Sequence, residues 1–187
     1  MRTFHSRQVY RNDWMSVRED RVELPGGSVG LYGVVDKQDF ALIIPVENDG
    51  FHLVEQFRYP VAHRCWEFPQ GSWPAAAKDS AADTADATRL AAAELREETG
   101  LTAASLDYLG RVHVAHGYSS QGCHIFVAED LTPGPPRREA TESDMRHQWV
   151  SEAELDRMVT EGALVDAPSL AALSLLDRVR GRRRPPG

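Results

Sequence analysis

The sequence predicts a single α+β domain, built as a layered α/β/α sandwich around a mixed sheet. Three observations support this fold class. The first half contains short segments rich in β-branched residues and separated by turn signals, a single long helical pattern occupies the middle, and two further helical patterns close the chain. Strands therefore precede, flank and follow one central helix. A length of 187 residues suits one domain with a substantial core.

The first half is predicted to form strands joined by tight turns. The turn signals are Pro25-Gly26-Gly27 and Asn48-Asp49-Gly50, and the second is typical of a hairpin between antiparallel strands. The predicted strands are residues 21–25, 28–35, 40–46 and 52–60.

The second half is predicted to begin with a glycine-bearing loop, WEFPQG, and a surface insertion over 72–84. The central helix then runs over 86–99 and ends at Gly100, which supplies a C-terminal stop. Ser151 and Glu154 form a capping-box pattern, so a helix is expected to begin there. The other expected elements are strands at 105–117, 122–131 and 147–150, a proline-rich loop over 131–144 and a final amphipathic helix over 169–179.

Composition excludes several classes of function. A net charge of −7 argues against broad nucleic-acid binding, because phosphate contacts need a basic surface. No apolar run approaches the roughly 18 residues of a membrane helix, so no membrane association is expected. Cys65 and Cys123 lie in apolar surroundings and are interpreted as buried free thiols in a reducing cytoplasm. The basic residues 181–187 are expected to form a disordered tail.

The central helix carries an unusual cluster of carboxylates, Glu94, Glu97 and Glu98. At about 100° per residue they fall on one face, where like charges oppose the helix unless cations neutralise them. A solvated acidic face is the alternative interpretation. Clustered carboxylates suit Mg²⁺ or Mn²⁺, and the helix has no histidine to favour zinc.

With WEFPQG before it, the stretch ELREETGL resembles the signature of the Nudix hydrolases. In this degenerate Nudix box, alanines stand at positions 85 and 93, where the family pattern has a glutamate and an arginine. Gly71 lies 23 residues before Glu94, where the pattern has 15, so the box holds an eight-residue insertion. The arginine normally orients the glutamates, and Arg89 and Arg96, the candidates to replace it, point away from the acidic face.

The resemblance extends over nearly the whole chain. VEQFRYPV, AHGYSSQGCHIFVAEDL and the segment from WVSEAELDRMV onward are similar to the ADP-ribose pyrophosphatase branch. This implies a Nudix-type sandwich, with N-terminal strands over 1–40 that are candidates for forming a homodimer and a Nudix hydrolase domain over 41–180.

The resemblance also implies roles for particular residues. Metal ligands would be Glu94, Glu97, Glu98 and the backbone carbonyl of Gln70, with Glu97 and Glu98 catalytic. The candidate general base is Glu142, with Glu139 and Asp144 as rivals. Candidate substrate-binding residues are Arg58 for phosphate, Trp14 (with Tyr32 as a rival) for adenine, and His116 and Gly117 at the mouth of the site.

The implied activity is Mg²⁺-dependent hydrolysis of ADP-ribose or a related nucleoside diphosphate sugar, which releases AMP and ribose 5-phosphate from ADP-ribose. Two alternatives stay open. One keeps the chemistry but changes the substrate to GDP-mannose or a dinucleoside polyphosphate. The other is a nucleotide-binding module without catalysis, although binding alone does not require all three helix glutamates.

Overall fold

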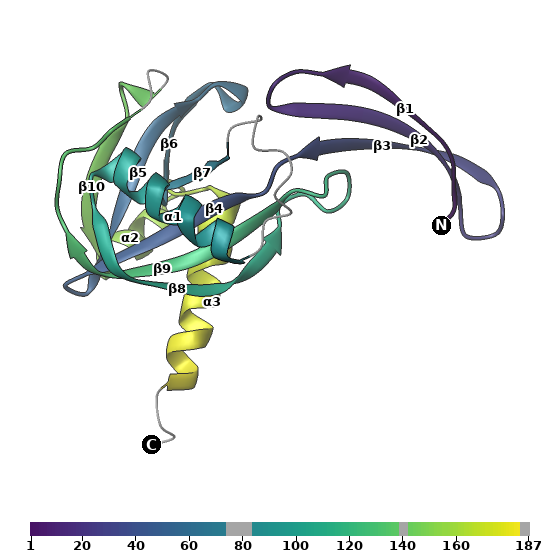
Figure 1. The fold of residues 1–187 in the computed structure, drawn as a ribbon. Helices are drawn as coiled ribbons and strands as arrows, with labels where there is room; N and C mark the ends of the chain where they lie inside the picture. Colours follow the sequence, from purple (N-terminus) through teal and green to yellow (C-terminus); the bar gives the residue numbers. More distant parts are fainter. Residues whose placement is uncertain (74–83, 139–141, 184–187) are drawn as a thin grey trace.

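The computed structural model describes residues 1–73, 84–138 and 142–183 (Figure 1). Two sheets and three α-helices make up these parts of the chain. The strands are β1 (Thr3–Arg11), β2 (Met15–Glu23), β3 (Val29–Lys37), β4 (Phe40–Glu47), β5 (Gly50–Arg58), β6 (His63–Glu67), β7 (Gln70–Ser72), β8 (Thr102–His113), β9 (Gly122–Thr132) and β10 (Arg146–Ser151). The helices are α1 (Thr84–Thr99), α2 (Glu152–Thr160) and α3 (Ala167–Arg183), and a 3₁₀ turn, η1 (Tyr59–Val61), joins β5 to β6.

The main sheet is mixed, as the sequence predicts. Its strand order is β10-β5-β4-β9-β8, with β6 paired to β5 and β7 paired to β4. Strands β4 and β9 run parallel, whereas the other pairs in this sheet are antiparallel. The strand β4 therefore lies in the middle of the domain and brings β7 and β9 to its two edges.

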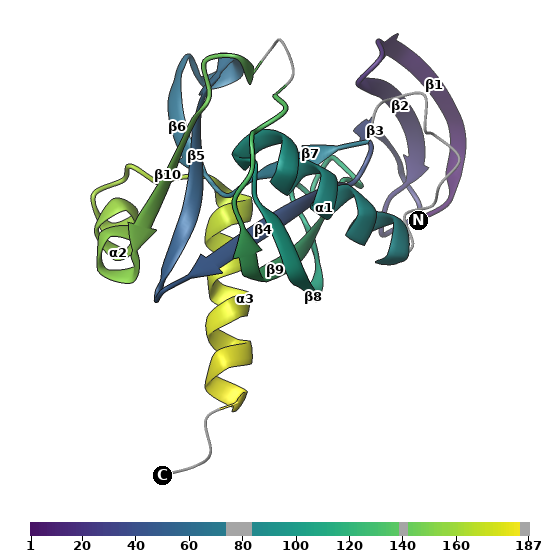
Figure 2. The ribbon, with the colours of Figure 1, turned by 60° about the vertical axis from the view of Figure 1, so that its left-hand side comes forward.

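Helices cover both faces of this sheet, which confirms the α/β/α sandwich (Figures 1 and 2). Side chains alternate between the faces of β4. Ala41 and Ile43 pack with α1 in one buried cluster, while Leu42 and Ile44 pack with α2 and α3 in the other. The first cluster holds α1 against one face of the sheet, and the second holds α2 and α3 against the other.

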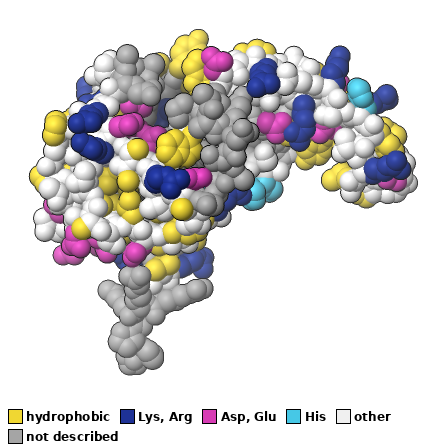
Figure 3. Space-filling model, in the orientation of Figure 1, with side chains coloured by type: hydrophobic (Ala, Val, Ile, Leu, Met, Phe, Trp, Pro, Cys, Tyr) yellow, Lys and Arg dark blue, Asp and Glu magenta, His cyan; other side chains and the backbone are white. Residues whose placement is uncertain are grey.

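The first three strands form a separate antiparallel sheet that extends from the body as an arm (Figures 1 and 3). The strand β1 is exposed along its whole length; N-terminal strands were expected over 1–40, but no strand was placed at residues 3–11. The strand β2 spans 15–23, whereas residues 21–25 were expected to form a strand. Both strands mix charged and apolar residues, and β1 buries no residue while β2 buries only Asp20 and Val22, so hydrophobic alternation gives little signal there.

Local signals in the sequence act as predicted at several points. Asn48 and Asp49 both have positive φ, at 49° and 58°, in the two-residue turn between β4 and β5. The Ser151 hydroxyl accepts the Glu154 N–H at 3.2 Å and so caps α2. The helix α3 continues to Arg183, so residues 181–183 are helical and the expected disordered tail is wrong there; residues 184–187 lie outside the described residues. Most of the predicted insertion lies outside the described residues.

Within those residues, none of the helices combines the length and apolar character that crossing a membrane would require. Cys65 and Cys123 are buried free thiols, as predicted.

Candidate active site

The candidate site forms where β7 meets the C-terminal half of α1. Gly71 lies directly against the carboxylate of Glu94, and a Cβ at this position would overlap that carboxylate. One residue earlier, the backbone N–H of Gln70 donates to Glu98 Oε2 at 3.1 Å. The WEFPQG loop and the acidic helix are thus joined at the two residues that the sequence pattern singles out.

Glu98 is the most deeply buried acid of the cluster, with 0% of its surface exposed. Its Oε1 atom has no hydrogen-bond partner among the described residues. Burial raises the pKa of Glu98 well above its usual value, and the neighbouring carboxylates of Glu94, Glu142 and Glu67 raise it further. A carboxylate held in this way is unstable as an isolated anion and favours a bound cation.

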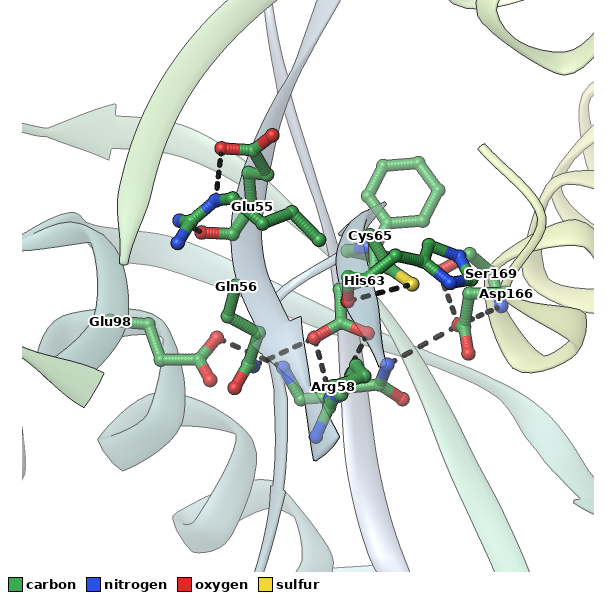
Figure 4. Close-up of polar contacts among 12 residues, drawn as sticks. Glu55, Gln56, Arg58, His63, Cys65, Glu98, Asp166 and Ser169 are labelled. Carbon is green, nitrogen blue, oxygen red and sulfur yellow. Dashed lines mark hydrogen bonds and ion pairs between the residues drawn. The ribbon is translucent and has the colours of Figure 1, made fainter. Parts of the chain in front are cut away.

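Near Glu98, the half-buried side chain of Arg58 (Figure 4) forms an ion pair with the buried carboxylate of Glu67. Arg58 Nη2 donates to Glu67 Oε1 at 2.5 Å, and Arg58 Nε donates to Glu67 Oε2 at 3.1 Å. Gln56 also donates to Glu67 Oε1, at 2.7 Å. Burial lowers the pKa of Arg58, but the Glu67 charge more than offsets this effect, so the guanidinium stays cationic.

The start of α3 fixes the other side of the loop. Asp166 Oδ2 accepts from the Ser169 backbone N–H at 2.9 Å and from the Ser169 hydroxyl at 2.7 Å. The Gln70 side chain also donates to Asp166, and the Phe68 N–H donates to Ser169 Oγ. Figure 4 shows Asp166 and Ser169 on the opposite side of Arg58 from Glu98. Neither residue was predicted to belong to the site.

Glu142 approaches the acidic helix from a turn that precedes β10. It lies near enough for its charge to raise the pKa of Glu98, which places it beside the metal-ligand candidates. Of its two rivals, Asp144 pairs with Arg64 at 2.6 Å, and Glu139 lies outside the described residues. Among the described acids of this loop, Glu142 is therefore the one whose charge acts on Glu98.

The remaining candidates lie farther from the acidic helix. Trp14 is 75% exposed in the turn between β1 and β2. His116 and Gly117 lie in the turn between β8 and β9, although a strand was predicted to continue to residue 117. The Tyr32 hydroxyl donates to the Gly117 carbonyl at 2.7 Å, so the arm supports this turn.

The arginine that the box lacks at Ala93 is not replaced from within the helix. Arg89 pairs with Asp86 one turn earlier, and Arg96 is exposed. Ala85 is also exposed, in the first turn of α1. The charge of Glu98 helps to raise the pKa of Arg58, which comes from β5.

The chemistry of the site fits a divalent cation. Its donors are hard carboxylate oxygens, and one of them, Glu98 Oε1, is buried without a partner. Within the described parts of the chain, however, no three His, Cys, Asp or Glu side chains already converge as a metal site. Glu94 and Glu98 are therefore candidate ligands that do not form a complete preformed cage.

Comparisons with known proteins decide the family. The NUDIX domain model matches residues 37–173, and the model of the nucleoside diphosphate sugar hydrolase N-terminal domain matches residues 1–35. The chain belongs to the Nudix family. It is a Nudix pyrophosphohydrolase of the ADP-ribose pyrophosphatase-like group, and enzymes of this family generally need a divalent metal.

Similar proteins cover almost the whole length of this Nudix enzyme. An ADP-ribose pyrophosphatase of Mycobacterium tuberculosis is 30% identical over 173 residues, which are 91% of this chain and 80% of that protein. An ADP-ribose pyrophosphatase of Bacillus subtilis is 26% identical, over 94% of this chain and 91% of that protein. The crystal structure of an ADP compounds hydrolase matches the fold with a TM-score of 0.80 at 20% identity, over 98% of this chain and 96% of that one.

Proposed function

We propose that this Nudix enzyme hydrolyses the diphosphate of ADP-ribose or a related nucleoside diphosphate sugar, with Mg²⁺ (or Mn²⁺) as its metal. From ADP-ribose, addition of water across the P–O–P bond gives AMP and ribose 5-phosphate. The observation that carries the proposal is the buried Glu98 carboxylate, flanked by Glu94 and Glu142 and placed next to the Arg58–Glu67 pair. Two relatives that span most of the chain are named for ADP-ribose hydrolysis.

Glu94, Glu98 and the Gln70 carbonyl would hold the metal, with Glu97 as a further ligand or support. A bound divalent ion screens the charge of the diphosphate and lowers the pKa of water near it. Gly71 leaves the space that the Glu94 carboxylate occupies, and the Gln70 N–H orients Glu98 Oε2. These contacts hold the Glu94 and Glu98 carboxylates next to the 70–71 backbone.

Glu142 is the proposed general base, which takes a proton from the attacking water. Its position beside Glu98 supports this role. Arg58 presents a guanidinium with 39% of its side chain exposed, while Glu67 holds it from behind. A planar guanidinium can bind phosphate oxygens in pairs, so Arg58 is the proposed contact for the diphosphate. Trp14, His116 and Gly117 stay proposed contacts for the nucleoside end.

The experiment that tests the function is AMP release from ADP-ribose with Mg²⁺, alongside GDP-mannose and a dinucleoside polyphosphate. We expect ADP-ribose to give the highest kcat/KM and Glu98→Gln to abolish turnover. A higher kcat/KM for another compound would identify that compound as the preferred substrate instead. If no diphosphate is cleaved while nucleotide still binds, the catalytic proposal fails and the alternative of a binding module holds.

We also propose that the arm mediates a homodimer. Its three strands expose large apolar side chains to solvent, among them Val9 at 50%, Val29 at 56% and Leu31 at 63%. A second copy of the chain would cover them. Light scattering is expected to give twice the monomer mass, and Leu31→Asp is expected to shift it toward the monomer. A monomeric wild-type chain would refute this proposal.

The free thiols of Cys65 and Cys123 fit a reducing compartment, so we place the enzyme in the cytoplasm.

A further inference from the structure

The turn that carries Glu142 is closed and anchored by its own backbone. The Met145 N–H donates to the Glu142 carbonyl at 2.9 Å, so residues 142–145 form a single hydrogen-bonded turn. The Met145 side chain is buried, with 3% of its surface exposed. The conformation of Glu142 therefore depends on where Met145 and its neighbours are held.

Arg138 joins this turn to the end of α1. Its Nε atom donates to the Glu98 backbone carbonyl at 3.0 Å, and its Nη1 atom donates to the Met145 carbonyl at 2.5 Å. The Glu98 carbonyl belongs to the last turn of the helix, where a cation also interacts favourably with the helix dipole. The guanidinium of Arg138 thus bridges Glu98 and the turn that carries Glu142.

Arg64 holds the same turn from the other side. Its Nη1 and Nη2 atoms donate to Asp144, at 2.6 Å to the carboxylate and 2.9 Å to the carbonyl. Its Nε and Nη2 atoms donate to Glu55 on β5, at 2.8 Å and 3.0 Å. Arg64 therefore ties the turn to the main sheet, whereas Arg138 ties it to the catalytic helix.

We propose that Arg138 and Arg64 are positioning residues that clamp the 142–145 turn and set the distance between Glu142 and Glu98. The inference builds on the proposed role of Glu142 as general base. Neither arginine contacts the reacting groups in this scheme, because Arg138 donates to the backbone carbonyls of Glu98 and Met145, and Arg64 donates to Glu55 and Asp144. Planar forks with several fixed donors suit this task, and a lysine ammonium cannot reproduce them.

A double-mutant cycle on the full-length enzyme with Mg²⁺ and ADP-ribose tests the catalytic consequence. Glu142→Gln is expected to lower kcat by about 10²- to 10⁴-fold. Arg138→Ala is expected to lower kcat by about 10- to 100-fold with KM changed by less than about 2-fold, because a displaced base loses efficiency while binding persists. In the Glu142→Gln background, Arg138→Ala should then change kcat by less than about 2-fold.

Hydrogen–deuterium exchange tests the clamp without relying on activity. The peptide that contains the Met145 amide should exchange faster in Arg138→Ala, because its closing hydrogen bond opens more often. Arg137→Ala is the matched control, since Arg137 is exposed and contacts Glu97 through its backbone N–H. This control should leave both kcat and exchange unchanged. Arg64→Lys provides a second variant that keeps the charge, and it should reproduce the faster exchange and the same non-additivity even if Arg138→Ala fails to fold.

The proposal is overturned if Arg138→Ala lowers kcat equally with and without Glu142, or if exchange at Met145 is unchanged in both variants. A wild-type kcat in Glu142→Gln would refute the proposed base. The exchange measurement would still decide whether the two arginines hold the turn.

Discussion

Replacing Glu98 with glutamine should stabilise the metal-free protein while it abolishes catalysis. The carboxylate is fully buried, its Oε1 atom has no hydrogen-bond partner among the described residues, and three other carboxylates raise its pKa. A glutamine side chain has nearly the same shape and no charge. Its carbonyl can still accept the Gln70 N–H, and its amide can donate to the neighbouring carboxylates.

The gain in stability follows from the unpartnered Oε1 atom of Glu98 and from the lost repulsion between Glu98 and the neighbouring carboxylates. A buried polar group without a partner costs about 1–3 kcal/mol of folding stability. Removing that cost should raise the free energy of unfolding by roughly 2 kcal/mol at pH 7. For a chain of this length, this corresponds to an increase in Tm of roughly 4–8 °C.

The assay is thermal unfolding of the wild type and Glu98→Gln in a chelator between pH 4 and pH 8. The folded-state pKa of Glu98 is raised above its usual 4.5, so the folded wild type retains a proton that the unfolded chain releases. The wild type therefore loses stability as pH rises above about 4.5. The advantage of the variant should vanish below that pH, where the carboxyl is protonated in both states, and should grow as pH increases.

Adding Mg²⁺ provides the second half of the test. At 100 times its Kd, a metal that binds only the folded state stabilises by about 2.7 kcal/mol, and Glu98→Gln should lose most of this gain. A variant with the same or a lower Tm than the wild type in chelator at pH 7 would contradict this account of Glu98. An equal Mg²⁺ response in both proteins would show that Glu98 is no ligand.

Three further outcomes are expected. Gly71→Ala should lower the affinity for Mg²⁺ by about tenfold or more in a metal titration, because its Cβ displaces the Glu94 carboxylate; an unchanged affinity would refute that contact. Arg58→Lys should raise KM for ADP-ribose about 10- to 100-fold, since a single ammonium cannot both pair with Glu67 and bind two phosphate oxygens, and an effect on kcat alone would contradict this role. Burial, together with the charges of His52 and Arg138, lowers the pKa of His147 to about 4, so the folded state favours the neutral ring. The free energy of unfolding should therefore fall as pH drops from about 6.5 toward 4. His147→Gln should flatten this pH dependence, measured by denaturant unfolding.

The main sheet and the central helix could be predicted because their signals are local. Alternating side chains on β4 separate the two buried clusters, and Asn48 and Asp49 adopt the positive φ values that a two-residue hairpin needs. Gly100, with a φ of +78°, ends the helix α1, and a Cβ there would overlap the Gly134 carbonyl. The signals for these elements lie within short stretches of sequence, so they can be recognised before any tertiary contact is known.

Other features depend on contacts between distant segments. Ser169 accepts from the Phe68 N–H, and Gln70 donates to Asp166, across about a hundred residues of sequence. The Asp-Ala-Pro-Ser pattern at 166–169 signals a helix start, but nothing in it indicates which loop the cap will contact. The bounds of β1 cannot be predicted from its residues for a related reason, because β1 pairs with β2 but buries no face of its own.

The alanine at position 93 shows how support for a site can move from the sequence motif into the tertiary structure. An arginine within the helix can reach only groups about one turn away. Within the helix the candidates are Arg89 and Arg96, and both point away from the acidic face. The fold instead brings Arg58 from β5 toward the side chain of Glu98, and Arg138 from the loop after β9 to its carbonyl. Arg58 also pairs with Glu67, and Arg138 also donates to the Met145 carbonyl in the 142–145 turn. A guanidinium that bridges two elements restrains their relative positions, whereas one confined to the helix would orient side chains only along its own face.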